Sequence, residues 1–195
     1  MAETDVRRQG PRRSETSQQA ILDATRIELA ENGWRRFSVD SVAKRARASK
    51  QTIYRWWPSI GAMCVDAGLE LIARPTHSGR DPRERIAALA LPFEDATRRG
   101  DGHAVLRASL MAAGDDEAAG ERWRAWFQDQ VRGPLRAILA ELAAKHVISR
   151  AWDLDTALEA LLGPFWHRLI VMRMPVQAGY ADKAAERILA LFRPG

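Results

Sequence analysis

The side chains best suited to recognising another molecule lie in one short segment of this 195-residue chain, residues 49–56. Lysine and arginine donate hydrogen bonds to guanine O6 and N7, glutamine pairs with adenine, and the methyl group of threonine contacts thymine. The segment reads SKQTIYRW, so all four residue types occur near the start of one expected helix. The predicted base-contacting residues are Lys50, Gln51, Thr52 and Arg55.

Two helices joined by a tight turn are expected to position these side chains. The first begins at Ser38, whose hydroxyl caps the free amides, and the helix dipole favours Asp40 in its first turn. The second begins at Ser49 and ends before Pro58. The buried face of the first helix follows helical spacing through Val39, Val42, Ala43 and Ala46. A helix-turn-helix of this kind places its second helix in the major groove of DNA.

Positive charge gathers at the same end of the chain. Residues 1–60 hold 12 Lys and Arg against 7 Asp and Glu, whereas residues 61–195 hold 18 of each, so the net charge of +5 lies near the helix-turn-helix. Residues 1–16 are predicted to form a disordered basic arm that adds phosphate or minor-groove contacts. Its arginines are Arg7, Arg8, Arg12 and Arg13. The charge bias alone is also compatible with an ordinary solvated segment.

Helical signals fill the remainder of the chain, and the absence of alternating strand-like runs predicts an all-α protein of about nine helices. The first helix is expected over residues 17–32, with Glu28 as a charge beside its apolar stripe. The inward residues of that helix are Ile21, Ala24, Thr25 and Leu29. A fourth helix is expected over residues 60–73, before a loop at 75–79.

Further helices are expected near residues 82–99, 102–113, 116–146, 153–174 and 180–192. The pair Gly133-Pro134 interrupts the longest stretch and predicts a kink or a split there. Residues 17–62 are predicted to form the helix-turn-helix domain. Residues 63–195 are predicted to form a larger helical domain for effector binding and dimerisation.

The order of these motifs resembles the TetR-type family of bacterial transcriptional regulators. Residues 21–24 (ILDA) with 30–34 (AENGW) are similar to the first helix of that family, and residues 37–43 to its second. Residues 52–58 (TIYRWWP) are similar to its recognition helix and the turn that follows. The resemblance implies a homodimeric regulator, most often a repressor, that binds a palindromic DNA operator and is released by a small effector.

The resemblance also adds contacts to the DNA backbone. It implies that the hydroxyl of Tyr54 holds a phosphate and that Trp56 contacts the sugar-phosphate backbone. Ser38 and Ser49, each at a helix N-terminus, suit phosphate contacts too, although plain capping explains both serines equally well.

Three positions depart from the family pattern. Glu28 replaces an apolar residue, and Ile60 replaces a lysine that usually contacts the DNA backbone. Arg47 replaces the usual glycine of the turn between the two helices. If this position needs a positive φ, the cost is of order 1 kcal/mol, although an arginine there also reaches a phosphate.

The resemblance places the dimer interface on the last two long helices, near residues 153–174 and 180–192. An apolar stripe on the first of them is wide enough for a partner helix, unless it faces the core of its own protomer. The predicted interface residues are Leu154, Leu158, Leu161, Leu162, Phe165 and Leu169.

The resemblance further implies an effector pocket among the middle helices. Aromatic and methionine side chains there suit a mostly apolar small molecule, and each is otherwise readable as ordinary core. The candidates are Phe93, His103, Leu106, Met111, Trp123, Trp126, Phe127, Trp166, His167 and Met172.

Other classes of function find little support in the sequence. We find no Gly-rich phosphate loop, no Cys-x-x-Cys motif and no metal-ligand spacing among the histidines and Cys64, so we expect neither an enzyme nor a cofactor or metal site. The alternatives are a helical protein-interaction module or a metal- or redox-dependent enzyme without DNA binding. The single cysteine favours the cytoplasm. The N-terminus lacks the apolar region of a signal peptide, and no run reaches the roughly 18 apolar residues of a membrane span.

Overall fold

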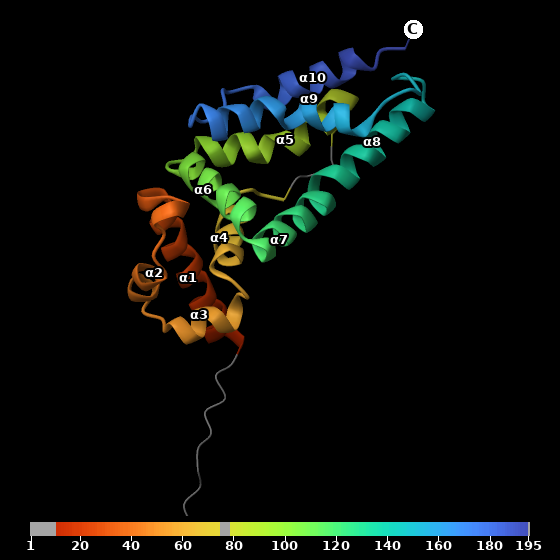
Figure 1. Cartoon of the computed structure of the whole chain (residues 1–195). Coiled ribbons are helices and arrows are strands. Elements are labelled where there is room, and N and C mark those ends of the chain that lie inside the picture. The colour runs from red at the N-terminus through yellow and green to blue at the C-terminus, as the bar shows by residue number, and fades with distance from the viewer. Residues whose placement is uncertain (1–10, 75–78, 195) are drawn as a thin grey trace, which may run out of the picture.

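The computed structural model describes residues 11–74 and 79–194, with side chains from Glu15 onward, and every regular element within them is helical (Figure 1). The prediction of an all-α protein is confirmed. The N-terminal elements are α1 (Pro11–Asn32), the short 3-10 turn η1 (Trp34–Arg36), α2 (Val39–Ala46), α3 (Lys50–Trp56) and α4 (Ile60–Leu69). We call the part from α1 to α3 the head.

The remaining helices form a larger body above the head in Figure 1. They are α5 (Pro82–Arg98), α6 (Gly102–Asp115), α7 (Glu117–Phe127), α8 (Gly133–Ala144), α9 (Leu154–Trp166) and α10 (Tyr180–Leu191), with π-helical turns η2 (Gln128–Arg132) and η3 (His167–Val171). Because α7, η2 and α8 continue one into the next, the ten α-helices of the described residues form nine separate rods.

The first helix is longer than expected. It begins at Pro11 rather than near Ser17, so residues 11–16 are helical and the prediction of a disordered arm is wrong for them. Proline suits the first turn of a helix because the backbone N–H that it lacks has no acceptor there. The remainder of the arm lies outside the described residues. The side chains of all four arm arginines, Arg7, Arg8, Arg12 and Arg13, do so as well.

The head is built around an apolar cluster to which every one of its helices contributes. The four residues expected to face inward on α1 are all buried, which confirms that stripe. The hydroxyl of Thr25 donates a hydrogen bond to the backbone carbonyl of Ile21 at 2.8 Å. The cluster continues through Ala67 of α4 and into α6, and therefore extends past the expected domain boundary after residue 62.

The charge expected beside the α1 stripe is buried and has two partners. Glu28 is only 2% exposed, and its Oε1 accepts hydrogen bonds from Asn32 Nδ2 at 3.0 Å and from the backbone N–H of Ser38 at 3.2 Å. In a capping box that N–H is taken by a glutamate three residues into the same helix, a position that Ser41 occupies here. Glu28 therefore completes the cap of α2 from a neighbouring helix.

A proline lies close to each of the two π-helical turns. Pro134 donates no backbone hydrogen bond, and Gly133 before it donates instead to the carbonyl of Gln128. The expected interruption is thus a π turn within a continuous rod. Pro164 leaves the carbonyl of Ala160 without its helical donor, and Arg187 of α10 donates to it at 3.3 Å.

The body places α10 beside α5 and α9 (Figure 1). A second buried carboxylate fixes this arrangement. Glu94 of α5 accepts hydrogen bonds from the backbone N–H groups of Gly179 at 2.8 Å and Ala181 at 3.0 Å, at the start of α10. The helix dipole favours a negative charge at that position.

Candidate nucleic-acid interface

Serine hydroxyls start both helices of the helix-turn-helix, as their sequence positions predicted. Ser38 Oγ accepts from the N–H of Ser41 at 3.3 Å, and Ser49 Oγ accepts from the N–H of Thr52 at 3.1 Å. The capping role of both serines is confirmed, and their phosphate contacts remain a prediction.

The N-terminal side of α3 faces solvent at the end of the molecule farthest from α9 and α10 (Figure 1). Lys50, Gln51 and Arg55 are exposed there, whereas Ile53 is buried in the head cluster. Thr52 is half-buried, and its hydroxyl lies 2.9 Å from Ser49 Oγ, which leaves its methyl group as the part suited to an apolar contact. Tyr54 is 51% exposed, as a phosphate-binding hydroxyl requires.

Lys50 has a partner that the sequence did not reveal. Its Nζ lies 2.6 Å from Oδ1 of Asp40 in the first turn of α2. The hydrogen bond and charge of Asp40 raise the pKa of Lys50, so the lysine is charged at all physiological pH values. An acidic residue is thereby placed beside a predicted base contact.

Arg47 forms the turn between α2 and α3 in a left-handed conformation, with φ 52° and ψ 38°. This geometry explains why glycine suits the position, because a Cβ atom disfavours positive φ. The side chain is exposed beside the start of α3.

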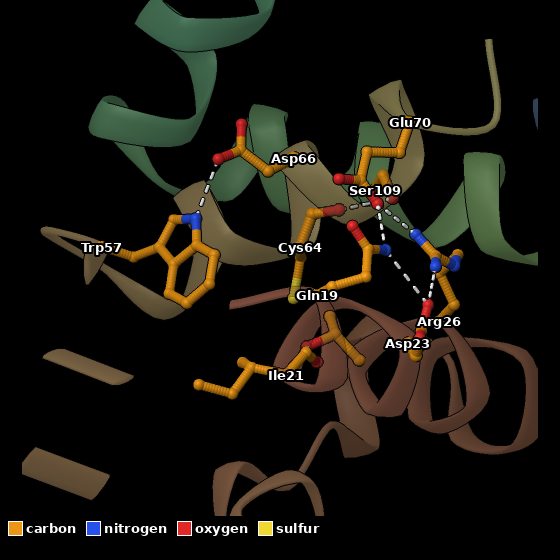
Figure 2. Close-up of polar contacts among 10 residues, drawn as sticks. Gln19, Ile21, Asp23, Arg26, Trp57, Cys64, Asp66, Glu70 and Ser109 are labelled. Atoms are coloured by element: carbon orange, nitrogen blue, oxygen red, sulfur yellow. Dashed lines mark hydrogen bonds and ion pairs between the residues drawn. The ribbon is translucent and has the colours of Figure 1, made fainter. Parts of the chain in front are cut away.

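The two tryptophans at the end of α3 differ in their role. Trp57 is buried, and its Nε1 donates to Oδ2 of Asp66 at 2.8 Å (Figure 2). Trp56 is half-buried, and its Nε1 is buried without an acceptor among the described residues. The indole N–H of Trp56 is therefore not presented to a DNA backbone, and any contact would be made by the exposed part of its ring.

Two consecutive aspartates in the turn between α6 and α7 bind the head and the start of α4. Asp115 Oδ2 accepts from the indole N–H of Trp34 at 2.9 Å. Asp116 Oδ1 accepts from Ser59 Oγ at 2.8 Å and from the N–H of Ala119 at 2.9 Å, so it caps α7 while holding the residue that caps α4. A third connection joins Arg122 of α7 to Asp66 of α4.

A cavity of about 660 Å³ lies beside this turn. Four of the ten predicted pocket residues line it: Met111, Trp123, Phe127 and Trp166. The other residues that line the cavity were not predicted from the sequence; they are Arg35, Leu110, Gly114, Asp115 and Ile170. Arg35 belongs to η1, outside the middle helices in which the pocket was expected.

The other predicted pocket residues lie elsewhere. Phe93 and Leu106 are buried in the core of the body, and Trp126 packs edge-on against Phe93 with ring centroids 5.8 Å apart. His167 and Met172 are exposed at the end of α9. His103 is half-buried at the start of α6 and does not line this cavity.

The predicted dimer residues require correction. Leu154, Leu161, Leu162, Phe165 and Leu169 are all buried inside the protomer, and Leu158 packs partly buried against the same cluster. The stripe therefore faces the core of its own chain. Periodicity identified the buried face of α9, but it could not say what covers that face.

Cys64 is fully buried, and burial raises the pKa of its thiol, so the reactive thiolate is disfavoured. Within residues 11–74 and 79–194, no group of three or more His, Cys, Asp and Glu is placed to hold a metal ion. None of the helices described is both long and apolar enough to cross a bilayer.

A small head with an exposed second helix, mounted on a larger helical body, defines a DNA-binding transcriptional regulator of the helix-turn-helix class. Residues 21–67 match the family described as bacterial regulatory proteins, tetR family. Residues 78–188 match the tetracyclin repressor-like C-terminal domain. The chain therefore belongs to the tetR family, which consists of transcriptional regulators and not enzymes.

Individual relatives agree with this assignment. The chain is 30% identical over 177 residues to the HTH-type transcriptional regulator Rv1556 of Mycobacterium tuberculosis, covering 88% of this chain and 83% of that protein. It is 27% identical over 176 residues to the HTH-type regulator YdeS of Bacillus subtilis, covering 89% and 88%. The crystal structure of the TetR family transcription regulator SCO0332 matches with a TM-score of 0.62 and 25% identity, over 91% of this chain and 99% of that one.

Proposed function

We propose that this DNA-binding regulator is a homodimeric repressor that reads a palindromic operator through α3 and leaves it when a small, mostly apolar ligand occupies a pocket in the body. Support for repression comes from the DNA-binding transcriptional repressor TetR of Mycobacteroides abscessus, 51% identical over 58 residues that cover 30% of each chain. Since bacterial operators lie in the cytoplasm, the proposed function implies that location.

The observation that carries the proposed operator contact is the exposure of one side of α3. Three polar side chains, Lys50, Gln51 and Arg55, project there, while the opposite side of the helix enters the head core. The proposed backbone contacts come from Ser38, Arg47, Ser49 and Tyr54. Two such helices about 34–36 Å apart would read the two halves of a palindrome.

The proposed dimer face is the exposed side of α9. Thr156, Ala160, Gly163 and His167 follow helical spacing along it, opposite the buried stripe. Beyond its chain neighbours and the local helix backbone, a Cβ added at Gly163 would meet no atom within 4 Å, so the surface of the protomer is open there and a partner helix could approach closely. Exposed apolar side chains at the end of this rod and just beyond it support an interface there; they are Ile170, Val171, Met172 and Met174.

The test of operator recognition begins with selection of bound duplexes from a random pool, followed by mobility-shift titration on the motif obtained. Gln51→Ala and Thr52→Ala are each expected to weaken binding roughly 5- to 100-fold, because a good base contact contributes about 1–3 kcal/mol of discrimination. Gln128→Ala, an exposed glutamine in the body, serves as the matched control. Unchanged affinity in both α3 variants would contradict the proposed interface.

Salt dependence separates this function from a protein-interaction module. Phosphate contacts release counterions, so the affinity for duplex is expected to fall linearly with salt on logarithmic axes. A module that binds only protein would show no such slope.

A further inference from the structure

The cavity beside the α6–α7 turn has one apolar wall and one charged end. Its apolar wall is formed by Leu110, Met111, Trp123, Phe127, Trp166 and Ile170. Its volume of about 660 Å³ falls in the range of small-molecule sites, roughly 300–1,000 Å³. The charged end combines Asp115 of the body with Arg35 of the head, so the cavity lies between the two parts of the molecule.

The apolar wall suits a flat ligand. Trp123 stacks on Phe127 with ring centroids 6.3 Å apart and an angle of 25° between the planes. Trp166 meets Trp123 edge-on, at 6.0 Å and 77°. These rings offer both faces and edges to a planar ring system, the two arrangements that aromatic pairs prefer.

The charged groups at the other end of the cavity differ in whether they already have a partner. Asp115 already accepts the hydrogen bond from Trp34, whereas the exposed guanidinium of Arg35 forms no ion pair within residues 11–74 and 79–194. A second guanidinium, that of Arg107, lies 3.9 Å from the sulfur of Met111 on the cavity wall, again without an acidic partner in the described part of the chain. Two cations without a counterion therefore flank the site, against one carboxylate that is already engaged.

We propose that this pocket binds a flat, largely apolar molecule carrying one anionic group, and that Arg35 is the residue that holds the anion. The inference rests on the proposed ligand-dependent function and names the chemical class of its ligand. Arginine is suited to this role because its planar guanidinium binds carboxylates and related anions through paired, charge-assisted hydrogen bonds. An aromatic cage next to a carboxylate could instead take a cation, and the experiment distinguishes the two.

The experiment compares two fluorescent probes that differ by a single group, with the full chain and no DNA. One is 8-anilinonaphthalene-1-sulfonate, and the other is N-phenyl-1-naphthylamine, the same ring system without the sulfonate. Arg35→Gln is expected to weaken the sulfonate probe about tenfold, since a hydrogen bond to a charged group is lost, and to leave the uncharged probe unchanged. The neighbouring Arg36→Gln, an exposed arginine that does not line the cavity, is expected to change neither.

A second variant tests the location. A Cβ added at Gly114, which lines the cavity, would meet no atom within 4 Å, so the side chain of Gly114→Leu begins in open space and takes up volume at the cavity. It is expected to weaken both probes several-fold while the thermal unfolding temperature stays within a few degrees of wild type. Asp115→Asn removes the only carboxylate of the lining and is expected to strengthen the sulfonate probe.

Three results would overturn the proposal. They are an unchanged sulfonate titration in Arg35→Gln, which is the result expected of a cation site, equal loss of both probes in that variant, and weaker sulfonate binding in Asp115→Asn. Operator titration without probe is measured separately on wild-type protein. If the protein does not bind the operator, the proposed DNA recognition is wrong. If the probe titrations give one of the three results above, the proposed ligand class is wrong.

Discussion

Lys50 carries a predicted base contact, yet its ammonium group lies 2.6 Å from the carboxylate of Asp40. Both side chains are at least half exposed, so the pair adds little to folding stability. Its importance lies in DNA binding, because the lysine must leave Asp40 to reach a base and because the carboxylate repels phosphates.

Removing this carboxylate is expected to strengthen DNA binding. Asp40→Asn should raise affinity for the selected operator several-fold and increase the magnitude of the salt slope by up to about one, as one more cation becomes available to phosphate or base. The measurement is a mobility-shift titration at several salt concentrations. Asp182→Asn, which breaks an exposed pair with Arg83 on the body, is the control. An affinity for Asp40→Asn at or below that of wild type would show that Asp40 does not restrain Lys50.

Arg47 combines an unfavourable backbone conformation with a charge suited to phosphate. Arg47→Gly should raise the free energy of unfolding by about 0.5–1 kcal/mol through relief at φ 52°, partly offset by greater freedom of the unfolded chain. The same variant should weaken operator binding. Thermal unfolding and DNA titration are expected to change in opposite directions, and Arg47→Lys should leave stability unchanged. A glycine variant that loses both stability and affinity would contradict this account.

At the scale of elements, a buried carboxylate on the side of one helix binds backbone amides at the start of another. Glu28 of α1 binds the first amide of the α2 cap, and Glu94 of α5 binds the amides at the start of α10. Each carboxylate accepts hydrogen bonds from backbone donors that would otherwise be buried without an acceptor. A charge that looks misplaced in one helix thus serves the terminus of another.

Glu28→Ala is expected to lower the free energy of unfolding by about 2 kcal/mol, because the N–H of Ser38 and the amide of Asn32 lose their acceptor. Glu28→Gln keeps an acceptor oxygen and should cost less. Glu31→Ala, on the exposed side of the same helix, should fall within about 0.5 kcal/mol of wild type. Denaturant unfolding measures all three, and equal stability of Glu28→Ala and Glu31→Ala would count against the cap.

The start of a helix was predictable from the sequence wherever a side chain caps the first backbone amides. Ser38 and Ser49 predicted their caps, and Gly133-Pro134 predicted an interruption that became a π turn. The start of α1 was not predictable from polarity, since residues 11–16 are polar whether helical or not. The partner of Glu28 could not be found from sequence either, because it depends on how α1 and α2 pack.

At the scale of the whole molecule, α9 has two different faces. Its apolar stripe packs inside the protomer, and the opposite side, with the half-buried Ala160 and Gly163, is the proposed dimer face. Sequence periodicity locates both faces but cannot assign them. The cavity was still harder to predict, because Arg35 reaches it from a three-residue turn far from the other lining residues in sequence.

Gly163→Trp is expected to convert the proposed dimer to monomer without unfolding the protomer, since a Cβ added there would meet no atom within 4 Å and the new side chain therefore begins in open space. Sedimentation or light scattering would measure the mass, and operator affinity should fall with it because one head reads only a half-site. Ala140→Trp on the exposed side of α8 is the matched control. A dimer that persists in Gly163→Trp would place the interface elsewhere.

The π turn between α7 and α8 sets the angular phase of a rod about 40 Å long. Asp116 caps the first half of the rod, α7, and the second half, α8, packs Leu135 and Leu139 into the body core. Each helical residue advances the chain by about 100°, so deleting one residue from 128–132 would rotate one half by that angle against the other. Apart from Val131, which is buried in the body core, the side chains of this stretch are exposed or half-buried, so most substitutions at those positions are expected to be tolerated. A change in the length of the stretch is expected to be as harmful as a change in the core.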